Sequence, residues 1–498
     1  MTVSVSAKWA GDDSHSFVQF SKTVLVHWAI QMTSNEPLAE RTRVAAVMTA
    51  IRQRVAARTL TRGDKLPSLR ATAGVMGVSI STVVEAYDRL AAEGIIQSRP
   101  GSGFYVAASS VPLSLADIGP RPKREVDPLW VSRQSLEAVE NILRPGCGWL
   151  PESWLPQASL RSALRALARG DDAALAEYGT PLGLLPLRQL LARRMSERDI
   201  HVSPQQILLT ESGTHAIDLL CRFLIEPGNT ILVDDPCYFN FHALLRAHRA
   251  KVVGVPYTRT GPDIASLAKV ISDHQPRVYI TNSGLHNPTG AGLAPAIAHQ
   301  VLKLAEQAQL TIIEDDIFAD LEHTPAPRLA AFDGVDRVVH IGSFSKTLSA
   351  SIRCGFIAVK QDWIEGLTDL KIATSFGGGR LNAEILFLAL RDGRYRKHLE
   401  HLRQRLSHAR TDVSRRLKVV GIEPWLEPEA GMFLWCRLPK GTDAADLAKA
   451  ALAENIVLAP GNVFSLSQSA HGFMRFNVSQ SQDKRLFDFL RAHLRRSR

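Results

Sequence analysis

The chain has 498 residues, more than a single hydrophobic core usually serves, so a small domain joined to a large one is expected. Hydrophobic residues make up 45% of it and charged residues 22%, which excludes the disordered and membrane-embedded classes for most of the chain. The net charge of +10 favours a polyanionic partner, of which DNA is one candidate.

Five cysteines are spread along the chain without a Cys-x-x-Cys pair. This spacing predicts neither a disulfide framework nor a zinc site, and it fits a reducing cytoplasm. The apolar stretch from Thr23 to Met32 is too short to span a bilayer, and no signal-peptide cleavage site follows it. We therefore expect a cytoplasmic protein with no membrane segment. The cysteines are Cys147, Cys221, Cys237, Cys354 and Cys436.

Composition and periodicity divide the chain into four parts. Residues 1–35 lack periodicity and are expected to form a disordered extension. Residues 36–106 form a small domain, which opens with an amphipathic helix from Leu38 to Arg58. Residues 107–128 are rich in proline and serine and are expected to form a linker. Residues 129–498 form the large domain.

The small domain has the pattern of a winged helix-turn-helix. One helix begins at Leu66–Arg70, a turn follows at Gly77–Ser79, and a second helix runs from Ser79 to Glu93 and ends at Gly94. Two short strands joined by a glycine-containing turn then form the wing; they are Ile95–Arg99 and Phe104–Val106. We expect Tyr87 and Leu90 to lie in the core of this domain.

Residues 40–106 closely resemble the GntR-type winged helix. The shared features are Leu-Pro-Ser-x-Arg, Val-Ser-x-x-Thr-Val, Ala-Tyr-x-x-Leu and Gly-Ser-Gly-x-x-Val. Serine and threonine at a helix start, with arginines nearby, suit phosphates and base edges. The residues expected to contact double-stranded DNA are Arg70, Ser79, Ser81, Thr82, Arg99, Gly101 and Gly103. Ile80 departs from the resemblance, because many members carry a cation there.

In the large domain, short β-rich runs alternate with helical stretches, which predicts a mostly parallel sheet with crossover helices. These runs are Gln206–Thr210, Thr230–Val233, Val278–Thr281 and Thr311–Glu314. A long helix from about Arg394, a strand at Gly431–Leu438 and a final helix at Gln482–Arg495 predict a smaller C-terminal α+β lobe. The fold class is therefore α/β, with a winged helix at the N-terminal end.

Ser343, Ser345 and Lys346 stand together in a short motif, and Arg353 follows seven positions after the lysine. A lysine whose amine can be neutral forms a Schiff base, and the hydroxyl and guanidinium donors suit a phosphate ester. From about Asp127 to the end, the chain resembles the fold-type I aminotransferases. Together with the winged helix, it resembles the MocR group of regulators.

This resemblance implies a pyridoxal 5'-phosphate (PLP) site with Lys346 as the Schiff-base residue. It implies that Asn287 hydrogen-bonds the ring hydroxyl and that Asp315 pairs with the pyridine nitrogen, which keeps the ring an electron sink. It also implies that Tyr238 stacks on the ring. The residues expected around the phosphate are Ser212, Gly213, Thr214, His215, Ser343, Ser345 and Arg353. His215 is equally compatible with a solvated helix cap.

Two further roles follow from the resemblance. Tyr178 matches a tyrosine that reaches the phosphate of the neighbouring subunit, so a homodimer is implied. Arg475 matches an arginine that holds a substrate carboxylate. The chain departs from the family after Asp315, where Ile317 and Phe318 stand in place of a tyrosine whose phenol donates to the ring oxygen.

Two functions are compatible with these residues. The first is a PLP-dependent transcription regulator that senses PLP or an amino acid through its aminotransferase-like domain, and the missing phenol favours it. The second is a catalytically active aminotransferase acting on an amino acid and a 2-oxo acid, with Lys346 as Schiff base and proton carrier. The otherwise complete set of cofactor residues keeps this second reading open.

Overall fold

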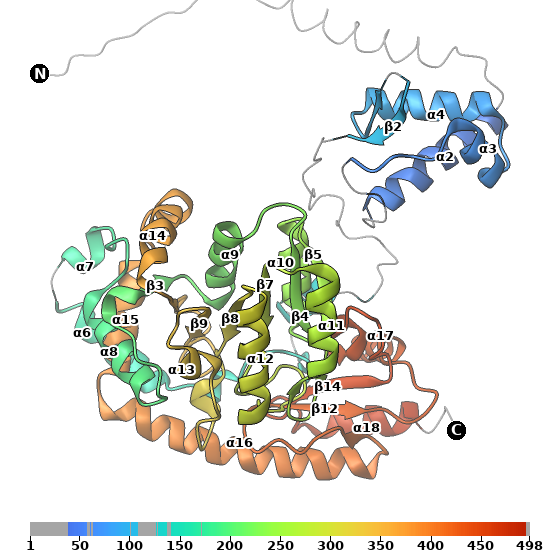
Figure 1. Ribbon diagram of the computed structural model, residues 1–498. Helices are drawn as coiled ribbons and strands as arrows, with labels where there is room; N and C mark the ends of the chain where they lie inside the picture. The colour runs from blue at the N-terminus through green and yellow to red at the C-terminus, as the bar shows by residue number, and fades with distance from the viewer. Residues whose placement is uncertain are drawn as a thin grey trace, which may run out of the picture. The chain divides into compact units, whose positions relative to one another are not determined.

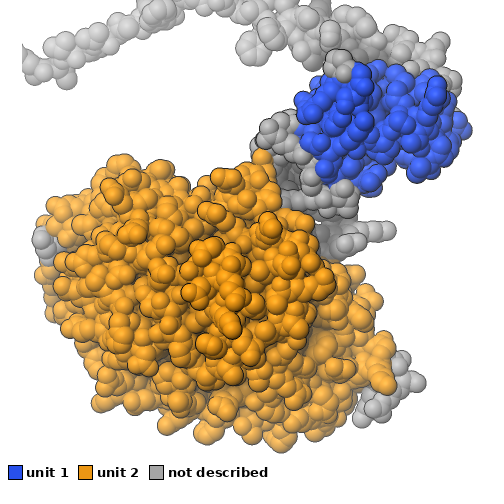
Figure 2. Space-filling model, viewed as in Figure 1, with its two compact units in different colours: residues 1–119 blue, residues 120–498 orange. Residues whose placement is uncertain are grey.

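The structure is a computed structural model that describes residues 38–56, 60, 63–99, 101–107, 126, 128–136, 141–170 and 172–494. The chain divides into two compact units, residues 1–119 and 120–498 (Figure 2). The extension predicted for residues 1–35 lies outside the described residues. No helix of the described ranges is long and apolar enough to cross a membrane.

Within its described residues, the small unit forms the expected winged helix-turn-helix with three helices (Figure 1). Its helices are α2 (Leu38–Ala56), α3 (Leu69–Met76) and α4 (Ile80–Ala92), and its wing strands are β1 (Ile96–Arg99) and β2 (Gly103–Val106), paired antiparallel. Ser68 caps α3 by accepting a hydrogen bond from the Ala71 N–H, and Gly77 ends it in the left-handed conformation. This pair of caps produces the tight turn into α4.

The core of the winged domain is formed by the inner faces of its helices and β1. Tyr87 and Leu90 of α4 are fully buried, so their predicted place in the core is confirmed. The Tyr87 hydroxyl donates to the Pro67 carbonyl at 3.1 Å and contacts the Thr72 hydroxyl at 2.9 Å. A buried phenol is stable only with such partners, and these hold α4 against the start of α3.

The large unit is built on an eight-stranded sheet in the order β3-β10-β9-β8-β7-β4-β5-β6. All pairs from β9 to β5 are parallel, whereas β10 is antiparallel to both its neighbours and β6 is antiparallel to β5. The strands are β3 (Ile207–Thr210), β4 (Thr230–Asp235), β5 (Lys251–Thr258), β6 (Gly261–Pro262), β7 (Val278–Thr281), β8 (Thr311–Asp315), β9 (Val338–Ser343) and β10 (Gly355–Ala358).

Helices cover both faces of this sheet (Figure 1), and a separate apolar cluster lies on each face. This explains why the strands are almost continuously apolar. The helices of this part are α6 (Gln157–Leu167), α7 (Ala173–Ala176), α8 (Leu185–Ser196), α9 (Gly213–Leu224), α10 (Phe239–Ala247), α11 (Ile264–His274), α12 (Pro295–Gln307), α13 (Leu329–Asp333), α14 (Gln361–Ser375) and α15 (Arg380–Leu390), with short 3-10 turns at Glu152–Trp154, Pro204–Gln206 and Ala319–Leu321.

The C-terminal lobe follows the 27-residue helix α16 (Gly393–Val419). Its antiparallel sheet has the order β11-β12-β14-β13, and helices α17 and α18 pack on it. The remaining elements are β11 (Glu423–Pro424), β12 (Phe433–Arg437), α17 (Ala444–Ala453), β13 (Ala459–Pro460), a 3-10 turn at Gly461–Phe464, β14 (Phe473–Asn477) and α18 (Lys484–Leu494). The predicted α+β lobe is therefore present.

The beginning of the large unit joins this lobe, which the sequence did not predict. Leu143 forms a parallel bridge with Ile456, and the Gly146 N–H donates to the Val457 carbonyl at 2.8 Å. Val126 is buried in the same lobe, and α5 (Pro128–Leu136) begins just after it. The last residues of the predicted linker 107–128 thus lie within the large unit.

Candidate cofactor site and DNA-binding surface

The candidate cofactor site lies where the parallel strands end. In such sheets, the carboxyl ends of the strands meet along one edge and ligands bind there. Asp315 ends β8, Ser343 ends β9, and Ser212 follows β3 at the start of α9. Residues far apart in the sequence are therefore brought to one place by the sheet.

Lys346 lies in the turn after β9, and its Nζ donates to the Gly148 carbonyl oxygen at 2.7 Å. Removal of its amine from water, reinforced by the charge of Arg475, lowers the pKa of Lys346 to about 8. A lysine with such a pKa has an appreciable neutral fraction near pH 7 to 8, as a nucleophilic amine requires. The ring of Phe318 faces this amine, with 6.0 Å between Nζ and the ring centroid.

Asp315 is only 4% exposed, and burial raises the pKa of its carboxyl to about 6. Its side chain accepts a hydrogen bond from the Ile317 N–H at 3.3 Å. Among the described residues, no cationic side chain forms a salt bridge with it. A buried carboxylate without a cation is costly, and a protonated pyridine nitrogen would supply the missing charge. The chemistry of this position therefore fits PLP.

Arg475 of β14 is almost fully buried and contacts one other predicted residue, Asn287. Its Nη1 donates to Asn287 Oδ1 at 2.8 Å, and its Nη2 donates to the Gly146 carbonyl oxygen at 2.7 Å. The guanidinium lies over the Phe433 ring, 4.2 Å from the centroid, and its Nε has no hydrogen-bond partner. Burial lowers the pKa of Arg475 to about 10, so it remains a cation at neutral pH.

A short segment, residues 144–149, passes over both Lys346 and Arg475, and we refer to it as the strap. Its carbonyls at Gly146 and Gly148 accept the hydrogen bonds just described. Asn477 Nδ2 donates to the strap carbonyl of Trp149 at 2.8 Å. A side chain in place of Gly146 would come within 2.5 Å of the backbone of residues 458 and 459, so only glycine fits. The strap was not predicted from the sequence, in which the Gly-Cys-Gly triplet at positions 146–148 is its one signal.

The predicted phosphate turn is held by its own hydrogen bonds. Ser212 caps α9 by accepting from the His215 N–H at 3.0 Å, and His215 Nδ1 accepts from the Glu211 N–H at 3.1 Å. Burial lowers the pKa of His215, which favours the neutral ring that this bond needs. Gly213 is buried, and a Cβ there would lie 3.1 Å from the Ile317 side chain. Ile317 therefore packs against the turn.

The remaining predicted residues differ in their surroundings. The Ser343 and Ser345 hydroxyls are 3.1 Å apart, next to the turn, while Thr214 and Arg353 are exposed. Tyr238 immediately precedes α10 and packs edge-to-face on Phe241. The predicted residues that lie together at the strand ends are Ser212, Gly213, Asp315, Ser343, Ser345 and Lys346.

Tyr178 does not join this group within one chain. It is 77% exposed and packs edge-to-face on Phe376, which is itself 65% exposed. Two large aromatic side chains in mutual contact on the surface are typical of an interface.

A buried ionic cluster lies behind Asp315. Arg328 Nη2 is 2.9 Å from Asp316 Oδ1 and 2.7 Å from Glu322 Oε2, and all three side chains are almost fully excluded from solvent. The two carboxylates hold the pKa of Arg328 well above its usual range. His340 adds contacts to Asp316 and to Glu314. The turn after β8 is thereby fixed by charge pairing as well as by packing.

In the small unit, the predicted DNA-contacting residues fall into three groups. Arg70, Ser81 and Arg99 are exposed, and Arg99 lies 4.4 Å from the centroid of the Tyr105 ring in the wing. Thr82 is only 4% exposed and Ser79 Oγ accepts from its N–H, so these two form the cap of α4. Gly101 and Gly103 adopt positive φ angles of 74° and 104°, which the wing turn requires.

A winged helix with exposed cations, carried on one chain with a half-buried lysine and a buried aspartate and arginine, defines a DNA-binding regulator with an aminotransferase-type domain. The comparisons with known proteins agree. Residues 43–106 match the family of bacterial regulatory proteins of the gntR type, and residues 150–491 match aminotransferase class I and II.

The chain is 30% identical over 438 residues to the uncharacterized HTH-type transcriptional regulator YdcR of Escherichia coli, covering 86% of this chain and 93% of that protein. It is 27% identical to the HTH-type transcriptional regulator NorG of Staphylococcus aureus, covering 82% and 94%. The large unit is similar in fold to LysN, an α-aminoadipate aminotransferase of Thermus thermophilus, with a TM-score of 0.67, 24% identity and coverage of 74% and 95%. The chain belongs to the GntR-type transcription regulators with an aminotransferase-like domain, as the MocR resemblance predicted.

Proposed function

We propose that this transcription regulator holds PLP on Lys346 and that an amino acid bound at Arg475 changes its affinity for DNA. The observation that carries the proposal is that a lysine of lowered pKa, just after β9, and the buried carboxylate of Asp315, at the end of the neighbouring strand β8, lie at the same edge of the sheet. The two groups match the aldehyde and the ring nitrogen of one ligand. The solved LysN structure is a complex with N-(5'-phosphopyridoxyl)-L-leucine, which supports a cofactor of this type in this fold.

Each residue has a definite part in holding the cofactor. Lys346 would carry it covalently, Asp315 would keep the ring nitrogen protonated, and Asn287, which accepts a hydrogen bond from Arg475, would bind the ring hydroxyl. Tyr238 would cover the ring, and the α9 N-terminus would hold the phosphate with further donors from residues 343–353. When bound, PLP supplies an electron-withdrawing ring and a carbonyl carbon that amines attack.

The strap provides the link between effector and response. An amino acid whose carboxylate binds Arg475 replaces the hydrogen bond from Arg475 to the Gly146 carbonyl. The strap is tied to α5 through Arg144, whose Nε donates to the Ser135 carbonyl at 3.2 Å. Residues 107–128 connect α5 to the winged domain in the sequence. A coupling of about 1–3 kcal/mol along this path would change DNA affinity about 5- to 150-fold.

The regulator acts as a homodimer in this proposal. The exposed pair of Tyr178 and Phe376 supports a contact with a second copy of the large unit. Two winged domains on one dimer would bind two half-sites of an operator, as helix-turn-helix dimers generally do.

An active aminotransferase is the second candidate, and one observation favours it. Lys346, Asp315, Asn287 and Arg475 together form a complete set for binding a cofactor and an amino acid. Against it, Ile317 and Phe318 are apolar, and Ile317 packs on the phosphate turn. No hydroxyl therefore reaches the ring oxygen from these two positions, which disfavours rapid turnover.

The test uses the full-length protein with PLP. Borohydride reduction followed by peptide mapping should place the reduced adduct on Lys346, and Lys346→Ala should give no adduct. Operator DNA is then obtained by selection from random duplexes, and its affinity is measured with each common amino acid in turn. At least one amino acid should shift the affinity about fivefold or more, and Arg475→Lys should abolish the shift. Rapid amino-group transfer without any change in DNA affinity would favour the enzyme instead.

A further inference from the structure

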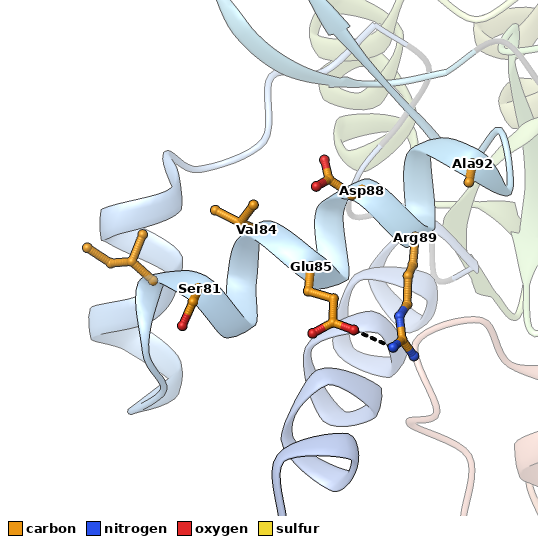
Figure 3. A pocket seen from close by; sticks show the side chains of 7 residues that line it. Ser81, Val84, Glu85, Asp88, Arg89 and Ala92 are labelled. Carbon is orange, nitrogen blue, oxygen red and sulfur yellow. Dashed lines mark hydrogen bonds and ion pairs between the residues drawn. The ribbon is translucent and has the colours of Figure 1, made fainter. Parts of the chain in front are cut away.

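The outward face of α4 carries an apolar patch that the folding of the winged domain does not explain. Ile80 is 48% exposed and Val84 is 37% exposed, one helical turn apart, with Ser81 beside them (Figure 3). The buried face of the same helix, including Val83 and Leu90, already supplies the core. We define the α4 reading face as residues 80, 81, 84, 85 and 88.

The hydroxyl groups at the start of α4 are largely engaged with one another. Ser79 Oγ accepts from the Thr82 N–H at 3.2 Å, and it lies 2.8 Å from the Ser81 hydroxyl and 2.7 Å from the Thr82 hydroxyl. Thr82 also faces the interior. The side chains that α4 presents outward in its first two turns are therefore mainly aliphatic.

The other end of the reading face is acidic. Glu85 pairs with Arg89 across one turn, and Asp88 follows Val84 by one turn along the helix (Figure 3). Carboxylates repel the DNA backbone, so the N-terminal half of α4 is the part suited to approach the bases. Arg89, which also lies beside this face, is paired with Glu85, and exposed cations away from the face include Lys65, Arg70 and Arg99.

Phosphate binding and base reading are thus separated in this domain. The cations off the helix suit phosphate contacts, which fix position without reading sequence. Aliphatic side chains cannot hydrogen-bond to base edges, and a polar edge buried against them would lose its water without compensation. In the major groove, the C5-methyl group of thymine is the apolar group that distinguishes a base.

We infer that Ile80 and Val84 recognise thymine methyl groups in the major groove of the operator. The inference rests on the DNA-binding function of the winged domain and specifies what that domain reads. Residues four apart are separated by about 6 Å along a helix, close to two base-pair steps of about 3.4 Å. The two side chains would therefore meet thymines within about two steps of each other in each half-site.

The experiment starts from duplexes selected by the full-length PLP-loaded protein from a random pool. Each thymine of the best duplex is replaced singly by deoxyuridine, which keeps the base pair and removes only the methyl group. One or two positions per half-site should lose about three- to fivefold in affinity, the value expected for one buried methyl group. Thymines elsewhere should be insensitive.

Matched variants assign the methyl groups to side chains. At one methyl-sensitive position each, Ile80→Ala and Val84→Ala should bind the thymine duplex and the deoxyuridine duplex with equal affinity. Both variants should keep the native circular dichroism spectrum and thermal midpoint. Val75→Ala is the control, because Val75 is 88% exposed on α3 and undergoes the same chemical change as Val84→Ala. It should retain the full preference for thymine.

The outcomes separate this inference from the function on which it rests. Failure to select any duplex would contradict DNA binding itself. Selected duplexes without a methyl-sensitive position, or full sensitivity retained in both Ile80→Ala and Val84→Ala, would overturn the inference and leave DNA binding intact. Altered oligomeric state in these variants with unchanged DNA affinity would overturn it too, because the patch would then be a protein contact.

Discussion

The two units place their functional side chains in opposite environments. In the large unit, Asn287, Asp315 and Arg475 are 1–4% exposed, and a sheet and a strap gather them from distant parts of the sequence. In the winged domain, the candidate DNA contacts are exposed and lie close together in the sequence. A buried charge affects both folding and ligand binding, whereas an exposed one affects binding almost alone.

The largest effect on folding is expected from Arg328→Ala. Removing this arginine leaves Asp316 and Glu322 buried without their cation, which costs about 3–5 kcal/mol in the free energy of unfolding. Urea denaturation measures it. The control is Arg415→Ala on α16, whose arginine is 70% exposed and pairs with Asp412. It should change the free energy by less than about 1 kcal/mol. Equal effects of the two substitutions would remove the contrast between buried and exposed charge.

An effect of intermediate size is expected from Asp315→Asn in the cofactor-free protein. Unlike Arg328→Ala, this substitution should increase the free energy of unfolding at neutral pH. Because the pKa of the folded carboxyl is raised to about 6, the folded state holds a proton that the unfolded state has released. Stability therefore falls as pH rises from about 4 to about 6, and it stays low above that range. Asparagine should flatten this dependence and raise the free energy of unfolding at pH 7.5 by about 1–3 kcal/mol.

The same substitution should weaken PLP binding about 10- to 100-fold, since it removes the charged partner of the ring nitrogen. Equilibrium dialysis measures this loss, and urea titrations at pH 4.5, 6 and 7.5 measure the stability. The exposed Asp369→Asn on α14 serves as control for both. A less stable Asp315→Asn protein at pH 7.5 would show that the carboxylate is stabilising in the absence of PLP, contrary to this account.

The smallest effect on folding is expected from Arg70→Ala and Arg99→Ala. Both side chains are exposed, so the free energy of unfolding should change by less than about 1 kcal/mol. Each should nevertheless flatten the dependence of log affinity on log salt concentration by about one unit, for one lost phosphate contact. Binding titrations at four salt concentrations measure the slope, with Arg415→Ala as the unchanged reference. An unaltered slope in both variants would place the phosphate contacts elsewhere.

The sequence predicted those parts of the molecule that short motifs specify. The order of elements in the winged domain, the buried Tyr87 and Leu90 and the α/β class all follow from periodicity and capping residues. The grouping of Asp315 and Lys346 at strand ends follows once a parallel sheet is expected. The roles of these side chains toward a cofactor remain predictions.

Other features have no signal in a single sequence. The strap acts through the backbone carbonyls of Gly146 and Gly148, and every residue type has a carbonyl. Arg475 and Asn287 are 188 positions apart, and only the folded chain shows that they touch. The burial of Thr82 depends on how the first turn of α4 is oriented against the core, and helical spacing alone does not determine this orientation.

In the proposed function, the strap would compete with a ligand carboxylate for Arg475. A ligand that takes the Nη2 position held by the Gly146 carbonyl would bind with an apparent affinity equal to the intrinsic affinity multiplied by the fraction of molecules in which the strap is released. With about 1% released, the apparent dissociation constant rises about a hundredfold. In this proposal, the hydrogen bond of one backbone carbonyl would set the ligand concentration at which the regulator responds, independently of the side chains that select the ligand.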